Sequence, residues 1–587
     1  MRRYTAQEGA ESVGRDGVLW PPGAPVGSFE VDRDALHTYA REKGVNTALY
    51  WLARSILQPF FLIYFRTSRK GMAHIPKSGP VIVTANHRSF LDPFVIGCCL
   101  RRPIYYVAKK ELFSHRIGGW LISRLGAFPV NRERGDAEML ATAEMILARG
   151  DCVLIFPEGT RVRPGPLGKA KTGAARLSLI SGAPVVPVAV VGTEKIRKGF
   201  RVRPHKVRIT IGRALRFPKV EREDLTPNLA LSVTDRIWSP ICLQWELLGG
   251  VAPLRRVAIV GAGSAGTALA VLLARANVDV VLACRNADQV QTLNRVKENE
   301  PYLPGVVLPD RVRAVRAADL DASACDLVCF AVPSRALPAA LAAHAPRMPQ
   351  STGIVLLSKG LVPHLGDLPA EYVAKRAAGH SVASIGGPAH AAGALEKGAA
   401  FVLASEDRVL LERLAAPLRE ARTYVETTSD VMGVEMAGCA KNVAALAAAA
   451  ALNGGPNAAG AAAGRVWAEI VAWAGERGAR LETFAGLAGA GDLVATVLAE
   501  GSRNRRAGEM LSKGLAVSEI EASIGQAIES LDTVPLLAAK LTQDGARAPE
   551  TRMLARLVAG QIDPERWRER VTTTKPARRK PSRSASA

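Results

Sequence analysis

His87 and Asp92 have residue types and a spacing that suit proton transfer. Four residues separate them in segment 86–92, NHRSFLD. At a strand-to-helix corner, a carboxylate at this distance can reach back to one imidazole nitrogen and leave the other facing a substrate. Acyl transfer from a thioester to an alcohol needs such a base, and the hydroxyl of the acceptor replaces a serine nucleophile. The pair therefore indicates acyl transfer to an alcohol.

A second segment, 156–161 with sequence FPEGTR, follows a short apolar run that predicts a strand. Arg161 offers a guanidinium and Thr160 a hydroxyl, two groups that bind phosphate well. Glu158 is free to orient its neighbours. This segment predicts a phosphate site near the base.

Gly261, Gly263 and Gly266 form a Gly-x-Gly-x-x-Gly pattern between a predicted strand at 256–260 and a predicted helix that begins near Ser264. This context favours a dinucleotide site at Gly261, Gly263, Ser264 and Gly266, because the glycines let the backbone approach a pyrophosphate at a helix N-terminus. The next strand ends in Arg285 instead of an acidic residue. An arginine there can pair with a 2′-phosphate, so the sequence favours NADP at least as much as NAD.

Reduction of a ketone by hydride transfer leaves an alkoxide that must be protonated, and a lysine suits that role. The chain contains several candidate lysines, and their spacing alone selects none of them.

The composition predicts a folded protein of three or four domains. The chain has 587 residues, 48% of them hydrophobic, and domains average roughly 150 residues. The eight cysteines are scattered without a zinc or disulfide spacing, which predicts reduced thiols, no metal and a cytoplasmic location. No secretory signal is recognisable.

The net charge of +23 requires an acidic partner or surface. Nucleic acid is disfavoured, because interleaved aromatic and basic residues, zinc knuckles and recognition helices are absent from the sequence. An anionic membrane surface fits better, since basic residues flank the apolar segment 48–65. Arg54 and Pro59 interrupt that segment, so it favours a helix lying in the interface over a spanning one. A helix buried in the domain is the alternative.

The order of predicted elements gives an α/β fold class. We expect a flexible arm at 1–47, a first α/β domain at 48–250, a second α/β domain of the Rossmann type at 255–428, an all-helical domain at 429–568 and a disordered basic tail at 569–587. Expected strands cover 80–85, 152–156, 185–191, 256–260, 278–283, 327–332, 353–357 and 401–404.

Residues 71–215 resemble the membrane-associated glycerolipid acyltransferases, the 1-acylglycerol-3-phosphate acyltransferase family. Four blocks carry the resemblance: 86–92, 126–132 (GAFPVNR), 156–161 and 185–188 (VVPV). The resemblance implies that His87 is the general base with Asp92 as its partner. It also implies a set of residues that hold the glycerol phosphate: Arg132, Glu158, Gly159, Thr160 and Arg161, with Lys171 as a further charge.

Residues 255 to about 568 resemble the NAD(P)-dependent glycerol-3-phosphate dehydrogenases. The matching stretches are 302–305 (YLPG), 331–334 (AVPS), 358–360 (SKG), 440–442 (AKN), 491–493 (GDL) and 502–506 (SRNRR). The resemblance implies that Lys441 is the catalytic lysine and that Lys359 lies beside substrate and cofactor. It further implies that Asp492 orients the lysines with Thr496 nearby, and that Arg503 and Asn504 bind the substrate phosphate.

Two positions depart from the dehydrogenase pattern. Ala265 replaces a bulky aromatic residue, and 389–391 read Ala-His-Ala where the family has Ser-Phe-Ala. The second change lies near the place where the family's cofactor and substrate meet, and a packing replacement is the favoured interpretation of His390.

The two resemblances imply a bifunctional enzyme of glycerophospholipid synthesis. One half would reduce dihydroxyacetone phosphate to sn-glycerol 3-phosphate with NAD(P)H. The other would acylate lysophosphatidate to phosphatidate at the inner face of the cell membrane, with acyl-CoA or acyl-ACP as donor. Three alternatives stay open: glycerol 3-phosphate itself as acceptor, one inactive half that serves in localisation or sensing, and reduction of another keto acid. A homo-oligomer is compatible with the sequence, which leaves the oligomeric state undetermined.

Overall fold

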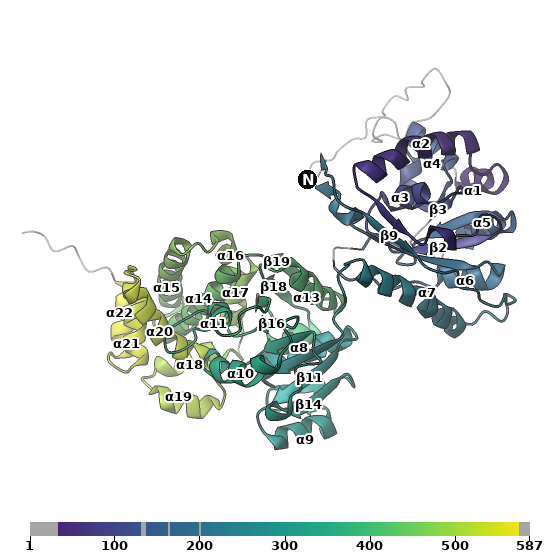
Figure 1. The fold of residues 1–587 in the computed structure, drawn as a ribbon. Helices are drawn as coiled ribbons and strands as arrows, with labels where there is room; N and C mark the ends of the chain where they lie inside the picture. Colours follow the sequence, from purple (N-terminus) through teal and green to yellow (C-terminus); the bar gives the residue numbers. More distant parts are fainter. Residues whose placement is uncertain (1–32, 131–136, 163–164, 199–200, 500, 574–587) are drawn as a thin grey trace, which may run out of the picture. The chain divides into compact units, whose positions relative to one another are not determined.

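The computed structural model describes residues 33–130, 137–162, 165–198, 201–499 and 501–573. The chain forms two compact units, Met1–Val251 and Ala252–Ala587, which are drawn in purple to blue and in teal to yellow in Figure 1. Each unit contains one large β-sheet with helices between its strands. The described part of the chain after Thr428 is helical.

The first unit consists of seven helices and nine strands among its described residues. The helices are α1 (Arg33–Glu42), α2 (Thr47–Ile63), α3 (Asp92–Cys99), α4 (Arg116–Arg124), α5 (Ala137–Ala148), α6 (Gly173–Ser181) and α7 (Pro227–Leu247). The strands are β1 (Ser68–Lys70), β2 (Val81–Ala85), β3 (Tyr105–Lys109), β4 (Ala127–Val130), β5 (Cys152–Ile155), β6 (Val185–Val191), β7 (Arg197–Lys198), β8 (Arg201–Val202) and β9 (Arg208–Ile211).

Seven of these strands form one sheet in the order β1-β9-β6-β2-β5-β3-β4. Its pairs are parallel except for β6 with β9. Alternate residues of β2 belong to two cores: Val81 and Val83 pack with α2 and α3, whereas Ile82 packs with α1, α5, α6 and α7. Helices thus cover both faces, which explains why the strands are continuous apolar runs. His87 follows the carboxyl end of the central strand β2.

Helix α1 corrects the expected limit of the N-terminal arm. It lies inside the segment 1–47, and its His37 is completely buried. The His37 Nδ1 atom is 2.8 Å from Thr142 Oγ1 of α5. This hydrogen bond satisfies a buried polar ring and shows that α1 belongs to the folded core. Residues 1–32 lie outside the described part of the chain.

The second unit begins with the sheet strands and the helices that cover them. Its strands are β10 (Arg256–Val260), β11 (Asp279–Cys284), β12 (Glu298–Asn299), β13 (Leu303–Val307), β14 (Val312–Arg316), β15 (Leu327–Phe330), β16 (Gly353–Leu356), β17 (Val382–Gly386), β18 (Ala400–Ala404) and β19 (Tyr424–Thr428). The helices among them are α8 (Ser264–Arg275), α9 (Ala287–Val296), α10 (Leu337–His344), α11 (Pro369–Arg376), α12 (Ala391–Glu396) and α13 (Arg408–Glu420).

Eight strands form a sheet in the order β14-β11-β10-β15-β16-β17-β18-β19. Counted along the chain without the β12–β13 hairpin, the first six positions read 3-2-1-4-5-6, the order of a Rossmann fold. The pairs are parallel except for β17 with β18. The strand order reverses between β10 and β15, and ligands of such folds bind at the carboxyl ends of the strands at that point.

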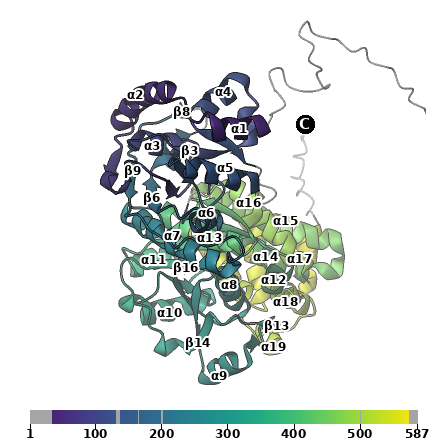
Figure 2. The same cartoon turned by 90° about the vertical axis from the view of Figure 1, so that its right-hand side faces the viewer.

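The remaining helices form the C-terminal part of the second unit, which is drawn in green and yellow in Figure 2. They are α14 (Val431–Ala450), α15 (Pro456–Glu476), α16 (Leu481–Ala485), α17 (Asp492–Leu498), α18 (Arg503–Leu511), α19 (Val517–Ile524), α20 (Glu529–Gln543), α21 (Pro549–Val558) and α22 (Pro564–Thr572). Helix α14 runs through their common core, and its residues from Gly433 to Ala450 are buried. The alanine-rich sequence makes this burial feasible, because small side chains allow neighbouring helices to approach closely on all sides.

Two helical stretches among the described residues are long and apolar enough to cross a membrane, Val431–Ala450 and Leu481–Leu498. The first is 89% buried inside the protein, as expected for a core helix. Helix α22 corrects the expected start of the tail, because it continues to Thr572 with Val571 buried. Residues 574–587 of that predicted tail lie outside the described residues.

The predicted fold class is confirmed, and each expected strand has a counterpart within about two residues. The strands that were not predicted are β1, β3, β4, β9, β14, β17 and β19 of the two large sheets, and the strands of the hairpins β7–β8 and β12–β13. They are short or carry polar residues, as Tyr424–Thr428 does with its mostly exposed pattern, so their apolar signal is weak.

Candidate active sites

His87 and Asp92 form a hydrogen-bonded pair at the end of β2. The His87 Nδ1 atom lies 2.9 Å from Asp92 Oδ2. Asp92 is fully buried as the first residue of α3, and the same oxygen also accepts the backbone N–H groups of Arg88 and Ser89, each at 2.7 Å. Because these donors fix the carboxylate, the imidazole is held in one orientation. Its Nε2 atom is the nitrogen left for a substrate.

The FPEGTR segment packs directly against this pair. The rings of Phe156 and His87 are stacked, with centroids 4.1 Å apart. Glu158 is buried, and its two oxygens accept the backbone N–H groups of His87 at 2.6 Å and Gly168 at 2.9 Å. Burial raises the pKa of Glu158, an effect that these hydrogen bonds oppose. The carboxylate therefore holds two loops together, and direct binding of a substrate phosphate, the role expected from the sequence, does not fit its position.

Three other expected phosphate ligands, Gly159, Thr160 and Arg161, lie on the same turn as Glu158. Gly159 has a φ of +71°, and a Cβ atom there would lie 3.1 Å from Lys171 Nζ, so the ammonium group sits against the glycine. Thr160 and Arg161 are exposed and can reach a substrate. Arg132 lies outside the described residues.

The glycine turn of the second unit fits a dinucleotide. A Cβ atom at Gly261 would lie 2.6 Å from Ala331 O, and one at Gly266 would lie 2.1 Å from Gly261 O, so both positions require glycine. Gly263 faces open space, and no side chain caps the N-terminus of α8 at Ser264. The free N–H groups can bind a pyrophosphate.

Arg285 follows the last residue of β11 and is exposed. It occupies the position at which the end of the second strand of a Rossmann fold approaches the adenosine ribose. Its placement is compatible with pairing to a 2′-phosphate.

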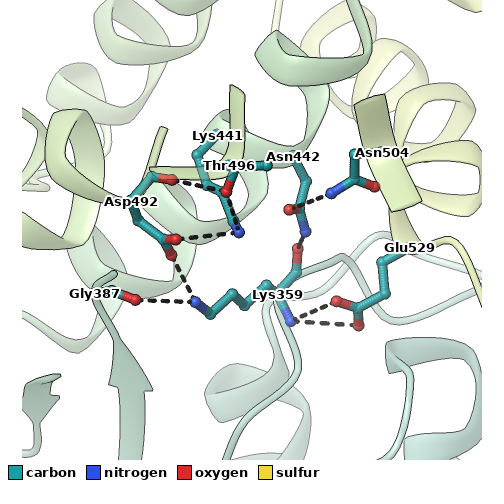
Figure 3. A network of polar contacts seen from close by, with 8 residues as sticks. All are labelled: Lys359, Gly387, Lys441, Asn442, Asp492, Thr496, Asn504 and Glu529. Atoms are coloured by element: carbon teal, nitrogen blue, oxygen red, sulfur yellow. Dashed lines mark hydrogen bonds and ion pairs between the residues drawn. The ribbon is translucent and has the colours of Figure 1, made fainter. Parts of the chain in front are cut away.

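Lys359, Lys441 and Asp492 converge from three distant parts of the chain (Figure 3). Lys359 Nζ donates to Asp492 Oδ2 at 2.6 Å, and Lys441 Nζ lies 3.3 Å from Asp492 Oδ1. Lys441 also donates to Thr496 Oγ1 at 3.0 Å, and that hydroxyl donates to Asp492 O at 2.7 Å. The residues come from the loop after β16, from α14 and from α17. One buried carboxylate thus bridges two ammonium groups.

The charges of this cluster shift its proton affinities. Burial, followed by the neighbouring Lys359 charge, lowers the pKa of Lys441 to about 8, although Asp492 opposes the shift. Burial alone would raise the pKa of Asp492, but the ammonium groups of Lys359 and Lys441 outweigh it and lower that pKa. Asp492 is therefore an anion, and Lys441 can gain and lose a proton near neutral pH.

Asn504 joins the cluster through a residue to which the sequence assigned no role. Its Nδ2 donates to Asn442 Oδ1 at 2.8 Å, and Asn442 Nδ2 donates to Lys359 O at 2.9 Å. Arg503 is exposed beside Asn504, and its Nη1 donates to Ala527 O at 2.9 Å. Five of the expected residues thus form one network, and Arg503 lies next to it.

Glu529 was missed by sequence reasoning, although it connects the cofactor turn with the lysines. It accepts the backbone N–H of Lys359 at 3.1 Å, and it accepts both the N–H and the hydroxyl of Ser334 at 3.2 and 3.0 Å. Ser334 closes the AVPS stretch whose Ala331 packs on Gly261. No local sequence pattern identifies Glu529, the first residue of α20, as part of the site.

His390 stands at the N-terminus of α12, three residues after Gly387, whose carbonyl accepts from Lys359 Nζ at 3.4 Å. Partial burial, followed by the charge of Lys441, lowers the pKa of His390. The residue that departs from the family pattern therefore lies in the electrostatic field of the lysines.

Three family models match the chain. Residues 66–191 match the acyltransferase model, residues 256–410 the NAD-dependent glycerol-3-phosphate dehydrogenase N-terminus, and residues 430–569 the C-terminus of the same enzyme. Among the described residues, no group of three or more His, Cys, Asp or Glu side chains is placed to hold a metal ion.

Curated relatives agree with the dehydrogenase models. The glycerol-3-phosphate dehydrogenase [NAD(P)+] of Xanthomonas campestris is 35% identical over 318 residues, 53% of this chain and 93% of the relative. That of Thiobacillus denitrificans is 37% identical over 307 residues, 52% of this chain and 93% of the relative.

A crystal structure of glycerol-3-phosphate dehydrogenase from Coxiella burnetii is 33% identical, with a TM-score of 0.51, and the match covers 54% of this chain and 98% of that one. The chain belongs to the NAD-dependent glycerol-3-phosphate dehydrogenase family, and it carries an acyltransferase domain ahead of the dehydrogenase on the same polypeptide.

Proposed function

We propose that this chain catalyses two reactions of glycerophospholipid synthesis. Its second unit reduces dihydroxyacetone phosphate to sn-glycerol 3-phosphate with NAD(P)H, and its first unit transfers an acyl group from a thioester to 1-acylglycerol 3-phosphate. The observation that carries the first activity is the buried Lys441–Asp492 contact at 3.3 Å. The His87–Asp92 contact at 2.9 Å carries the second.

In the reduction, Lys441 is the proton donor. The nicotinamide supplies the hydride when bound, and the glycine turn of α8 holds the pyrophosphate of that cofactor. Protonated Lys441 stabilises the developing alkoxide and then protonates it. Asp492 keeps both lysines oriented, while Arg503 and Asn504 hold the substrate phosphate at the edge of the site.

In the acyl transfer, His87 Nε2 removes the proton from the acceptor hydroxyl. Asp92 holds the opposite ring nitrogen and stabilises the imidazolium that results. The hydroxyl oxygen attacks the thioester carbonyl, and the C–S bond breaks. The protonated His87 gives its proton to the departing sulfur, which leaves as a thiol. Thr160, Arg161 and Lys171 bind the acceptor phosphate.

The acceptor decides how the two activities relate. With 1-acylglycerol 3-phosphate, another acyltransferase must act between the two steps. With glycerol 3-phosphate, the product of the dehydrogenase is the direct acceptor. We propose the first arrangement because the four sequence blocks of residues 71–215 resemble the 1-acylglycerol-3-phosphate acyltransferases.

Two assays of the full chain test this proposal. The first follows NADH or NADPH oxidation with dihydroxyacetone phosphate, each cofactor supplied separately. The second supplies labelled acyl-CoA or acyl-ACP with either acceptor and separates the lipid products. Absence of both acylated products would disprove the acyltransferase activity, provided that limited proteolysis shows the first unit of the same sample to be folded.

An exposed apolar face of the first unit supports a membrane location. Leu52, Ile56, Phe60 and Ile63 project from one side of α2 with 44 to 78% of their surface exposed. Trp120 and Ile117 of α4 are also exposed, and both views show α2 and α4 at the same end of the unit (Figures 1 and 2). Aromatic and aliphatic side chains on an exposed helix face suit insertion into a lipid interface.

We propose that this face binds anionic membranes, with the exposed Lys109 and Lys110 beside α4 contacting lipid phosphates. Cosedimentation of the full chain with phosphatidylglycerol vesicles tests the proposal. An Ile56→Ser/Ile63→Ser double variant should bind at least tenfold more weakly, while unchanged binding would exclude this face.

A further inference from the structure

Arg88 lies between the catalytic histidine and its carboxylate partner in the chain, yet its side chain points into the protein. It is 6% exposed, and its Nη2 donates to Gly165 O. Gly165 belongs to the loop that follows the FPEGTR segment. This hydrogen bond links the catalytic loop to the loop that carries the phosphate ligands.

The face of Arg88 is covered by Trp245. The guanidinium carbon lies 4.7 Å from the centroid of the indole ring, within the range of a cation–π contact. Trp245 is 3% exposed on the last turns of α7. This helix lies outside residues 66–191, which match the acyltransferase model.

Trp245 is itself held from two sides. Its ring packs with Ala189 and Val191 of β6. Its indole N–H donates to Val251 O at 3.3 Å, and the Gly250 N–H donates to Trp245 O at 2.9 Å. A Cβ atom at Gly250 would lie 2.2 Å from the ring. The segment 249–251, which ends the first unit, is thus folded onto the tryptophan.

Two further contacts make the catalytic and phosphate loops a single assembly. Val162 N donates to His87 O at 3.0 Å, and Glu158 accepts His87 N at 2.6 Å. A change in the position of Arg88 would therefore move both the base and the loop that holds the acceptor.

We infer that Trp245 is a positioning residue for acyl transfer: through Arg88 it fixes the His87 loop and residues 158–162 and 165–168, and it ties their geometry to the segment that leaves the first unit. The inference rests on the proposed acyl transfer at His87. Trp245 is buried and lies against the Arg88 guanidinium, so its effect on the reaction is transmitted through Arg88.

Three variants of the full chain test the inference. Trp245→Leu removes the aromatic face but keeps an apolar side chain. Trp245→Phe keeps one aromatic ring over Arg88 and loses the second ring and the indole N–H. Leu247→Ala, at a position on the same helix that is 78% exposed, is the matched control. The dehydrogenase rate of each sample reports the concentration of chain with a folded second unit, and resistance of the first unit to limited proteolysis reports whether that unit is folded.

The expected acyl-transfer kcat falls about tenfold in Trp245→Leu. It returns to within about threefold of wild type in Trp245→Phe, because an aromatic face again covers the guanidinium. It is unchanged in Leu247→Ala. A kcat of Trp245→Leu above half of wild type would overturn the inference, as would a phenylalanine variant as impaired as the leucine variant.

Arg88→Lys changes the other partner of the same contact, because it removes the guanidinium and leaves Trp245 in place. We expect a similar loss of kcat, and the Arg88→Lys/Trp245→Leu chain should be no slower than the slower single variant. Effects that multiply would show independent roles and overturn the inference. If Trp245→Leu does not fold, Arg88→Lys alone decides, since an unchanged kcat in that variant overturns the coupling.

Wild-type assays separate this inference from the function on which it rests. A wild-type chain that acylates neither acceptor overturns both. A wild-type chain that acylates normally, together with an unaffected Trp245→Leu variant, overturns the positioning role alone.

Discussion

In the acyltransferase unit, the candidate base His87 and its carboxylate partner are five residues apart in sequence, on one loop between β2 and α3. In the dehydrogenase unit, Asp492 is 51 residues from Lys441 and 133 from Lys359. The first pair is formed by a single corner of the chain. The second needs the Rossmann sheet and the helical part to be folded and docked.

This difference shows how much of each site a short motif can encode. A loop pair depends on local backbone geometry, so its residues can be recognised from their spacing. A cluster built from three elements depends on packing between them, so only a family-wide resemblance could select its lysine. The comparison predicts that variants of one site leave the other unaffected, and that variants of the assembled cluster act on several groups at once.

The largest effect is expected for Lys441→Met. Removal of the only proton donor that we assign to the reduction, which also stabilises the alkoxide, should lower kcat by about 10⁴-fold. NADH oxidation with dihydroxyacetone phosphate measures it, and the acyl-transfer rate of the same chain is the control. Retention of a tenth of the reductase activity would falsify the assignment of Lys441.

His87→Ala should lower acyl transfer by about 10³-fold, the range typical of a lost general base. The reductase rate should not change, because the side chain belongs to a separate unit. Formation of labelled phosphatidate measures the loss. A simultaneous fall of both activities would break the comparison, since it would mean that the two sites are not independent.

Asp492→Asn should lower reduction by about 10²-fold, because it leaves two ammonium groups without their shared anion. It should also shift the pH profile. Reduction requires protonated Lys441, so the wild-type rate falls as pH rises through the lysine pKa of about 8.

The Asp492 charge raises the pKa of Lys441, so its removal should move this alkaline limb to lower pH. Rates measured from pH 6 to pH 10 in buffers of constant ionic strength give the limb. A limb at unchanged pH would mean that the carboxylate does not act on the lysine.

The smallest effect is expected for Arg285→Ala, which should weaken the binding of NADPH relative to that of NADH by about tenfold. The guanidinium is exposed and would contact only the 2′-phosphate. KM values for the two cofactors measure the change, and equal losses for both would show that Arg285 does not distinguish them.

Most of the fold could be predicted from the sequence, because the patterns that indicate strands and turns are local. The apolar run at 185–191 predicts β6, and the glycine pattern at 261–266 predicts the turn before α8, since strand burial and close backbone approach leave a composition that can be recognised. Helix α1 was missed because its packing partners lie far along the chain, as the contact of His37 with Thr142, 105 residues away, illustrates.

The roles of two glutamates show the same limit within the sites. Glu158 belongs to a recognisable block, yet its burial between His87 N and Gly168 N gives it a positioning role. Glu529 belongs to no block, yet it bonds the backbone of Lys359. The partners of both carboxylates depend on which loops meet, and a linear pattern does not contain that information.

The sequence by itself determined the α/β class, the order of an acyltransferase and a dehydrogenase, the His87–Asp92 pair and the glycine turn. Each of these depends on residues that are neighbours along the chain. Tertiary structure alone decided that Lys359 and Lys441 share Asp492, that Glu158 is buried, and that Trp245 covers Arg88. These contacts join residues tens to more than a hundred positions apart, so the packing of helices and loops around each sheet determines them.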